Sequence, residues 1–109
     1  MGLSIFIGPV AQRDLGSSAA WYAARRNGLD HEFLLEFDQC IRSIRSSPGG
    51  YKRLRGNIRQ AVMSSRFPYV VVYAVEPDRV NIMRVFHAKR DPATKLKGLP
   101  RTRRIRRGS

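Results

Sequence analysis

Apolar residues in the first half of the chain recur with two different periods. The segment 3–7 is short, β-branched and aromatic and stops at a Gly-Pro pair, which predicts a strand. The segment 10–26 carries apolar residues three and four positions apart, and the segment 30–46 does so more regularly, at Phe33, Phe37, Cys40, Ile41 and Ile44. Because this spacing places side chains on one face of a helix, both segments are predicted to be helical. Only a short break at Asn27-Gly28 separates them, so we expect an antiparallel helical hairpin.

The second half of the chain has the pattern of β structure. After a Ser-Ser-Pro-Gly-Gly break at 46–50, the segments 57–63, 67–75 and 79–87 are apolar and are separated by turn residues. Three such strands in succession predict a three-stranded antiparallel meander. The order of N-terminal strand, two helices and meander predicts an α+β fold with both helices packed on one face of an antiparallel sheet. The opposite face is expected to be polar.

Length and composition indicate a single folded domain with a C-terminal tail. The sequence has 109 residues, of which 42% are hydrophobic, as in ordinary globular proteins. The β pattern ends near Asp91-Pro92, and the remainder of the chain is rich in basic residues interrupted by glycine and proline. We therefore predict a domain at 1–93 and a basic, flexible C-terminal tail at 94–109.

The charge balance points to an anionic partner. Lys and Arg number 21 against 8 Asp and Glu, a net charge of +13. From Lys95 onward there are seven basic residues and no acid, which leaves 14 basic and 8 acidic residues in 1–94, a net +6. The body is therefore basic without its tail. Nucleic acid, a nucleic-acid machine or an acidic protein would each be attracted to such a surface, and charge alone does not choose among them.

Several classes of protein are disfavoured. Cys40 is the only cysteine, which excludes an intrachain disulfide and a cysteine-based zinc site, and its apolar neighbours predict a buried thiol. His31 is expected on the surface, far from the only other histidine, so we expect neither a metal nor a cofactor. No apolar run approaches the roughly 18 residues of a membrane span, and the start lacks the features of a signal peptide. These observations favour a soluble, cytoplasmic protein without a membrane partner.

One constellation could carry chemistry. His87 ends the last predicted strand within a group of arginines. A neutral imidazole acting as base, with Arg59 and Arg84 binding phosphate, would suffice for metal-independent cleavage of RNA through its 2′-hydroxyl. The alternative is that His87 packs or forms hydrogen bonds for structural reasons and that the arginines are solvated.

Other residues are candidates for binding. Six cations are candidate contacts to a nucleic acid or another target: Lys52, Arg53, Arg55, Arg66, Lys89 and Arg90. The first three lie in what we predict to be a loop before the sheet, where solvation is the alternative. Trp21 and Tyr22 are either packing residues or an interface covered by a partner, since aromatic side chains are common interface anchors.

Taken together, the motifs resemble those of the ParE/RelE toxin superfamily of type II toxin–antitoxin systems. The resemblance spans about residues 3–92. It is carried by Asp14-Leu15, Trp21-Tyr22, Gly28-Leu29, Phe33, Phe37, Pro48, Tyr51, Arg66-Phe67-Pro68-Tyr69-Val70-Val71-Val72-Tyr73 and Val85-Phe86-His87-Ala88-Lys89-Arg90-Asp91-Pro92. It implies a helical hairpin on an antiparallel sheet. It also implies a cognate antitoxin that wraps an acidic, amphipathic segment around the toxin in a hetero-oligomer.

The resemblance leaves two activities open. RelE-like toxins cleave mRNA on the ribosome and often use a tyrosine near the C-terminus, whereas ParE-like toxins poison DNA gyrase and are not known for nuclease chemistry. No tyrosine follows Tyr73, and the His87-x-x-Arg90-Asp91-Pro92 ending is more similar to ParE sequences. A ParE-like inhibitor of gyrase is therefore favoured. The alternatives are a RelE-like mRNA interferase that uses His87, Arg59 and Arg84, and a basic nucleic-acid-binding module without toxicity.

Overall fold

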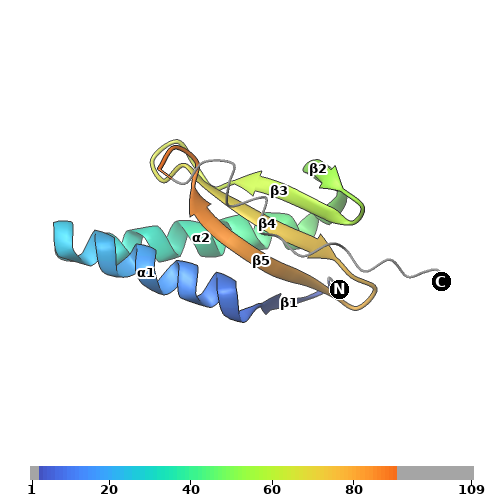
Figure 1. Ribbon diagram of the computed structural model, residues 1–109, viewed down its shortest axis with the longest axis horizontal. Helices are drawn as coiled ribbons and strands as arrows, with labels where there is room; N and C mark the ends of the chain where they lie inside the picture. Colours follow the sequence, from blue (N-terminus) through green and yellow to red (C-terminus); the bar gives the residue numbers. More distant parts are fainter. Residues whose placement is uncertain (1–2, 91–109) are drawn as a thin grey trace.

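A sheet of five strands carries two helices on one face (Figure 1). The computed structural model describes residues 3–90; the predicted basic tail at 94–109 lies outside this range. The elements occur in the order β1 (Ser4–Ile7), α1 (Pro9–Arg25), α2 (Leu29–Ser46), the 3-10 turn η1 (Pro48–Gly50), β2 (Lys52–Arg55), β3 (Ile58–Val62), β4 (Tyr69–Val75) and β5 (Arg79–His87). The predicted α+β fold, with its helical hairpin and its meander, is confirmed.

The helical hairpin has clear local causes. Pro9 stands at the first turn of α1, where a missing N–H costs nothing, and the N–H of Gly8 before it donates to the carbonyl of Ile82 on β5 at 3.0 Å. Gly28 joins the helices in the left-handed region, with φ of 87°, which favours glycine. Asp30 and Glu32 lie in the first turn of α2, where the helix dipole favours negative charge.

The sheet is mixed, which corrects the prediction of an antiparallel sheet. The strand order is β1-β5-β4-β3-β2, and β1 pairs with β5 in parallel, with Ser4 opposite Arg79 and Ile7 opposite Ile82. The two helices connect β1 to the rest of the sheet and return the chain so that β1 meets the open edge of β5. The three-stranded meander itself, β3-β4-β5, is antiparallel as predicted.

The segment 52–55, predicted as a loop, is the edge strand β2. It pairs with β3 through a tight turn in which Gly56 has φ of 53°. Only Leu54 among its four residues is apolar, so the strand carries no periodic signal. Exposed cations on such an edge discourage pairing with another sheet.

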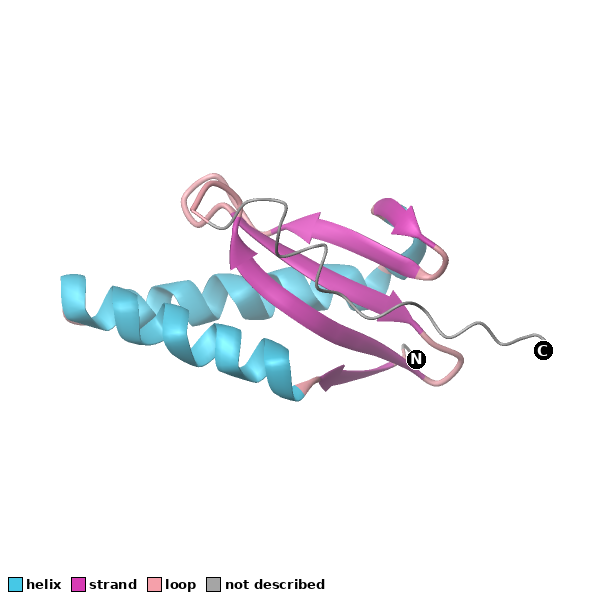
Figure 2. Cartoon of the chain, viewed as in Figure 1, coloured by secondary structure: helices cyan, strands magenta, loops and turns pink. Residues whose placement is uncertain are grey.

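β4 lies in the middle of the sheet, between β3 and β5 (Figure 2). It is buried on both faces, so the core has two parts. The larger part lies between helices and sheet and includes Phe33, Phe37 and Ile44 from α2 against Val71 and Tyr73 from β4. The second part lies on the other face and consists of Ile58, Val70, Val72, Ala74 and Phe86. The prediction of a polar second face is therefore wrong at its centre, where β-branched residues of β4 alternate between the two parts.

Candidate functional site

Arg84 is held inside the molecule by Asp14 of α1. Its Nε donates to Asp14 Oδ2 at 2.9 Å and its Nη2 to Asp14 Oδ1 at 3.2 Å. The backbone N–H of Val85 donates to the same Oδ2 at 2.9 Å. The side chains of Arg84 and Asp14 are only 15% and 16% exposed. β1 pairs with β5 only as far as Ile82, so the backbone N–H of Val85 has no strand partner there. Asp14 accepts a hydrogen bond from this N–H and also binds the Arg84 guanidinium.

Arg59 is also used within the fold. It lies on β3 opposite Tyr73 of β4, and its Nη1 donates to the carbonyl of Tyr51 at 2.7 Å. The Tyr73 hydroxyl donates to the carbonyl of Pro48 at 2.7 Å. Together these two bonds fasten the segment that connects α2 to β2. Burial raises the pKa of Tyr73 to about 12, which keeps this hydroxyl protonated, although the nearby Arg59 lowers it slightly.

His87 caps the turn after β5. Its Nδ1 accepts the backbone N–H of Lys89 at 3.1 Å and that of Arg90 at 3.0 Å. These two N–H groups occupy the Nδ1 lone pair, so this nitrogen is not available to take a proton from a substrate in this arrangement. The ring also lies edge-on to Tyr69, with centroids 5.2 Å apart.

The three residues proposed for RNA cleavage do not converge. His87 lies opposite Tyr69 of β4, whereas Arg59 lies opposite Tyr73 on the other side of that strand. Four residues along a strand span about 13 Å, and the two strands that flank β4 lie about 10 Å apart. The backbones of His87 and Arg59 are therefore well separated, and the Arg59 guanidinium is bonded to the Tyr51 carbonyl.

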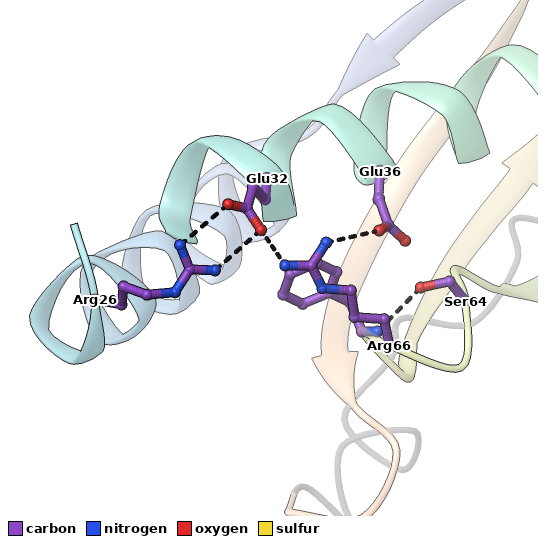
Figure 3. A network of polar contacts seen from close by, with 6 residues as sticks. Arg26, Glu32, Glu36, Ser64 and Arg66 are labelled. Atoms are coloured by element: carbon purple, nitrogen blue, oxygen red, sulfur yellow. Dashed lines mark hydrogen bonds and ion pairs between the residues drawn. The ribbon is translucent and has the colours of Figure 1, made fainter. Parts of the chain in front are cut away.

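Arg66 belongs to an internal ion-pair network (Figure 3). Its guanidinium pairs with Glu32 and, at 3.9 Å, with Glu36 of α2. Glu32 also accepts from both terminal nitrogens of Arg26, at 3.2 and 3.1 Å. Hydrogen bonds from Arg26 and Arg66 lower the pKa of Glu32 below its usual range. The network connects the β3–β4 loop to the start of α2, and the Arg66 side chain remains 52% exposed.

Trp21 and Tyr22 have different environments. Tyr22 is buried, in contact with Phe33 and Phe67, and burial together with the neighbouring Tyr69 raises its pKa to about 12. Trp21 lies near the C-terminal end of α1 and is 38% exposed. Of the two aromatic residues predicted as an interface, Trp21 alone offers surface to a partner.

Two guanidinium groups flank the Trp21 ring. The Cζ of Arg25 lies 3.5 Å from the ring centre and that of Arg90 lies 4.1 Å from it. Arg90 is further oriented because its Nη2 donates to the Tyr69 hydroxyl at 2.8 Å. Lys89 and Arg90 are exposed, and so are Lys52, Arg53 and Arg55 on β2, at the far edge of the sheet. The candidate binding cations therefore form two separate groups.

The family of the chain can be stated from comparison with known proteins. The family described as the ParE toxin of the type II toxin–antitoxin system parDE matches residues 5–92. The chain belongs to the ParE toxin family. Among solved structures, a chain titled "Chromosomal ParDE TA system from P. aeruginosa" matches with a TM-score of 0.67 at 15% identity, over 80% of this chain and 97% of that one. That likeness establishes the fold. Comparison with curated proteins found no match.

Membership of the ParE family makes the chain a type II toxin and implies an antitoxin as its partner. Within residues 3–90 there is no group of His, Cys, Asp or Glu side chains that could hold a metal ion. No helix in that range is long and apolar enough to cross a membrane. Cys40 is buried, as predicted, and burial raises the pKa of its thiol to about 11.

Two residues that organise the site, Asp14 and Arg25, were not predicted as site residues, although Asp14 is among the residues that carry the resemblance. Asp14 is the only acid before Asp30, and it directly precedes Leu15 on the helix face that turns toward the sheet. An isolated acid at the border of an apolar stripe is a signal for a buried partner, but the partner lies 70 residues away. Arg25 gave no signal beyond its spacing of four residues from Trp21.

Proposed function

We propose that this ParE-family toxin inhibits DNA gyrase by binding to it, without nuclease chemistry of its own, and that a cognate antitoxin neutralises it. The observation that carries the proposal is the occupation of Arg84 by Asp14. A phosphate-binding arginine would have to break a bidentate, mostly buried ion pair before it reached a substrate.

Two further observations support a binding mechanism. The Nδ1 of His87 already accepts two backbone N–H groups and is therefore not available as a base. Arg59 lies on β3, separated from β5 by β4, and is bonded to the Tyr51 carbonyl. Each candidate for RNA cleavage thus has a role in the fold, and the family resemblance to gyrase-directed toxins supplies the target.

The test is a gyrase supercoiling assay with the purified chain, with and without its antitoxin. We expect inhibition, or gyrase-dependent DNA breakage, that the antitoxin relieves. The proposal would be refuted if a preparation that arrests growth did not inhibit supercoiling at micromolar protein.

His87→Asn separates this mechanism from mRNA cleavage. The asparagine Oδ1 occupies the place of Nδ1 and can accept the same two backbone N–H groups, but it cannot exchange protons near neutral pH. We expect this variant to arrest growth as the parent does. A folded His87→Asn protein that neither arrests growth nor cleaves mRNA on ribosomes, beside a parent that does both, would favour the RelE-like alternative.

A further inference from the structure

The arginines of the described chain divide into those with and those without a carboxylate partner. Arg26, Arg42, Arg66, Arg79 and Arg84 each form an ion pair within residues 3–90. Near the C-terminal end of α1, by contrast, Arg25 and Arg90 have no carboxylate partner in that range, and both guanidinium groups lie against the Trp21 ring. We call Trp21 with these two arginines the Trp21 cluster.

The Trp21 cluster is ordered before any partner arrives. Two guanidinium groups this close to one ring centre cannot share a face without overlapping, so Arg25 and Arg90 lie on opposite faces of Trp21. Their charges are thereby held roughly 7 Å apart. Arg90 is fixed a second time by the Tyr69 hydroxyl, which is itself buried. Fixing long cationic side chains in advance reduces the entropy that binding must otherwise cost.

The same geometry disfavours single-stranded nucleic acid as the occupant. Proteins bind unpaired bases by stacking them on open aromatic faces. Both faces of Trp21 are occupied by guanidinium groups, so neither is open for a base to stack on, although the residue is 38% exposed. The groups left for a partner are the N–H edges of two guanidinium groups beside an apolar ring. Guanidinium N–H groups bind carboxylates, which an acidic protein chain supplies.

We propose that the Trp21 cluster is a binding site for two carboxylates of an acidic protein segment, with Arg25 and Arg90 each taking one. Side chains two residues apart on an extended chain are about 6.5 Å apart, and those four apart on a helix are about 6 Å apart, so either spacing fits. The inference rests on the proposed function only in naming the antitoxin as the source of that segment.

Trp21 is the only tryptophan of the chain, so its fluorescence and its indole N–H resonance report on this site alone. The full chain is titrated with a short peptide that carries two aspartates two residues apart, in about 0.15 M salt, where diffuse surface attraction is weakened. The spacing control is a peptide of equal charge with its aspartates adjacent. Arg25→Gln and Arg90→Gln remove one arm each, and Arg13→Gln removes an exposed charge from the same helix as a matched control.

We expect the spaced peptide to shift the Trp21 resonance saturably and to bind more tightly than its control. Arg25→Gln and Arg90→Gln should each weaken binding about five- to tenfold, and Arg13→Gln less than twofold. Equal losses in all three variants would mean diffuse attraction and overturn the proposal. Tighter binding of a short oligothymidylate at Trp21 would overturn it in favour of nucleic acid. None of these measurements involves gyrase, so the site and the proposed function can fail separately.

Discussion

Replacing Asp14 on α1 by alanine should strongly lower the free energy of unfolding. The substitution removes two hydrogen bonds from Arg84 and one from the Val85 N–H, and it leaves the Arg84 side chain, which is 15% exposed, without its partner. Removing one member of a buried ion pair costs about 3–5 kcal/mol, and residual solvent access here reduces that to about 2–4 kcal/mol. A domain of this size has about 5–15 kcal/mol in total, so the loss is a large fraction.

The assay is urea unfolding, monitored by circular dichroism and by Trp21 fluorescence. At a slope of about 1.5 kcal/mol/M, the midpoint of Asp14→Ala should fall by roughly 2 M. The matched control is Asp38→Ala, which breaks the exposed Asp38–Arg42 pair, with side chains 54% and 78% exposed, and should cost at most about 0.5 kcal/mol. If Asp14→Ala cost no more than this control, the Asp14–Arg84 contact would not stabilise the fold as argued.

A double variant connects this prediction to function. Asp14→Leu with Arg84→Leu replaces the ion pair by apolar side chains, which is often neutral for stability. We expect the double variant to recover most of the stability that Asp14→Leu alone loses, and still to arrest growth. Recovered stability with abolished growth arrest would show that the Arg84 guanidinium acts on the target, and the assignment of a structural role would be withdrawn.

Three further predictions concern stability and reactivity. Burial of the Cys40 thiol, with its pKa of about 11, should make it unreactive toward a disulfide reagent until urea unfolds the chain, and prompt reaction of the native protein would contradict its burial. Burial raises the pKa of Tyr73 in the folded protein from 10 to about 12. The protonated hydroxyl therefore contributes roughly 2–3 kcal/mol to the free energy of unfolding below pH 10, and this contribution is lost as the pH rises through 12. The free energy of unfolding of a Tyr73→Phe variant should depend less on pH over that window. Gly28→Ala should cost about 1 kcal/mol because φ at this residue is positive. Gly16→Ala should stabilise the protein by about 0.5–1 kcal/mol, because Gly16 lies inside α1 and a Cβ added there has no atom within 4 Å. Equal effects of the two variants in urea unfolding would refute the conformational argument.

The sequence predicted the elements whose signal is periodic. Both helices begin and end within a residue of the predicted bounds, and the strands of the meander lie where apolar runs alternate with turns. The edge strand β2 was missed because it pairs with a neighbour on one side only and contains a single apolar residue, so it has no alternation of apolar and polar residues. The parallel pairing of β1 was missed because direction depends on how the hairpin returns the chain, which no local spacing records.

The candidate site was harder to predict because composition counts charges without their partners. Six cations were candidate contacts, and a seventh and eighth, Arg59 and Arg84, were candidate catalytic groups. Arg84 meets an aspartate 70 residues earlier, and Arg66 meets Glu32 34 residues earlier. Contacts at such separation are made by the tertiary fold, so a sequence can show that a cation exists but not whether it is available.

Availability is what separates binding from catalysis in this molecule. The cations near the middle of the sheet are held by carboxylates and carbonyls of the fold, and those at its two ends, Arg90 beside Trp21 and Lys52 on β2, are exposed. A catalytic site needs several groups around one reacting atom. A binding surface needs charges spread over an area that a partner can cover. The distribution of exposed charge thus supports the proposal that this toxin acts by binding its target.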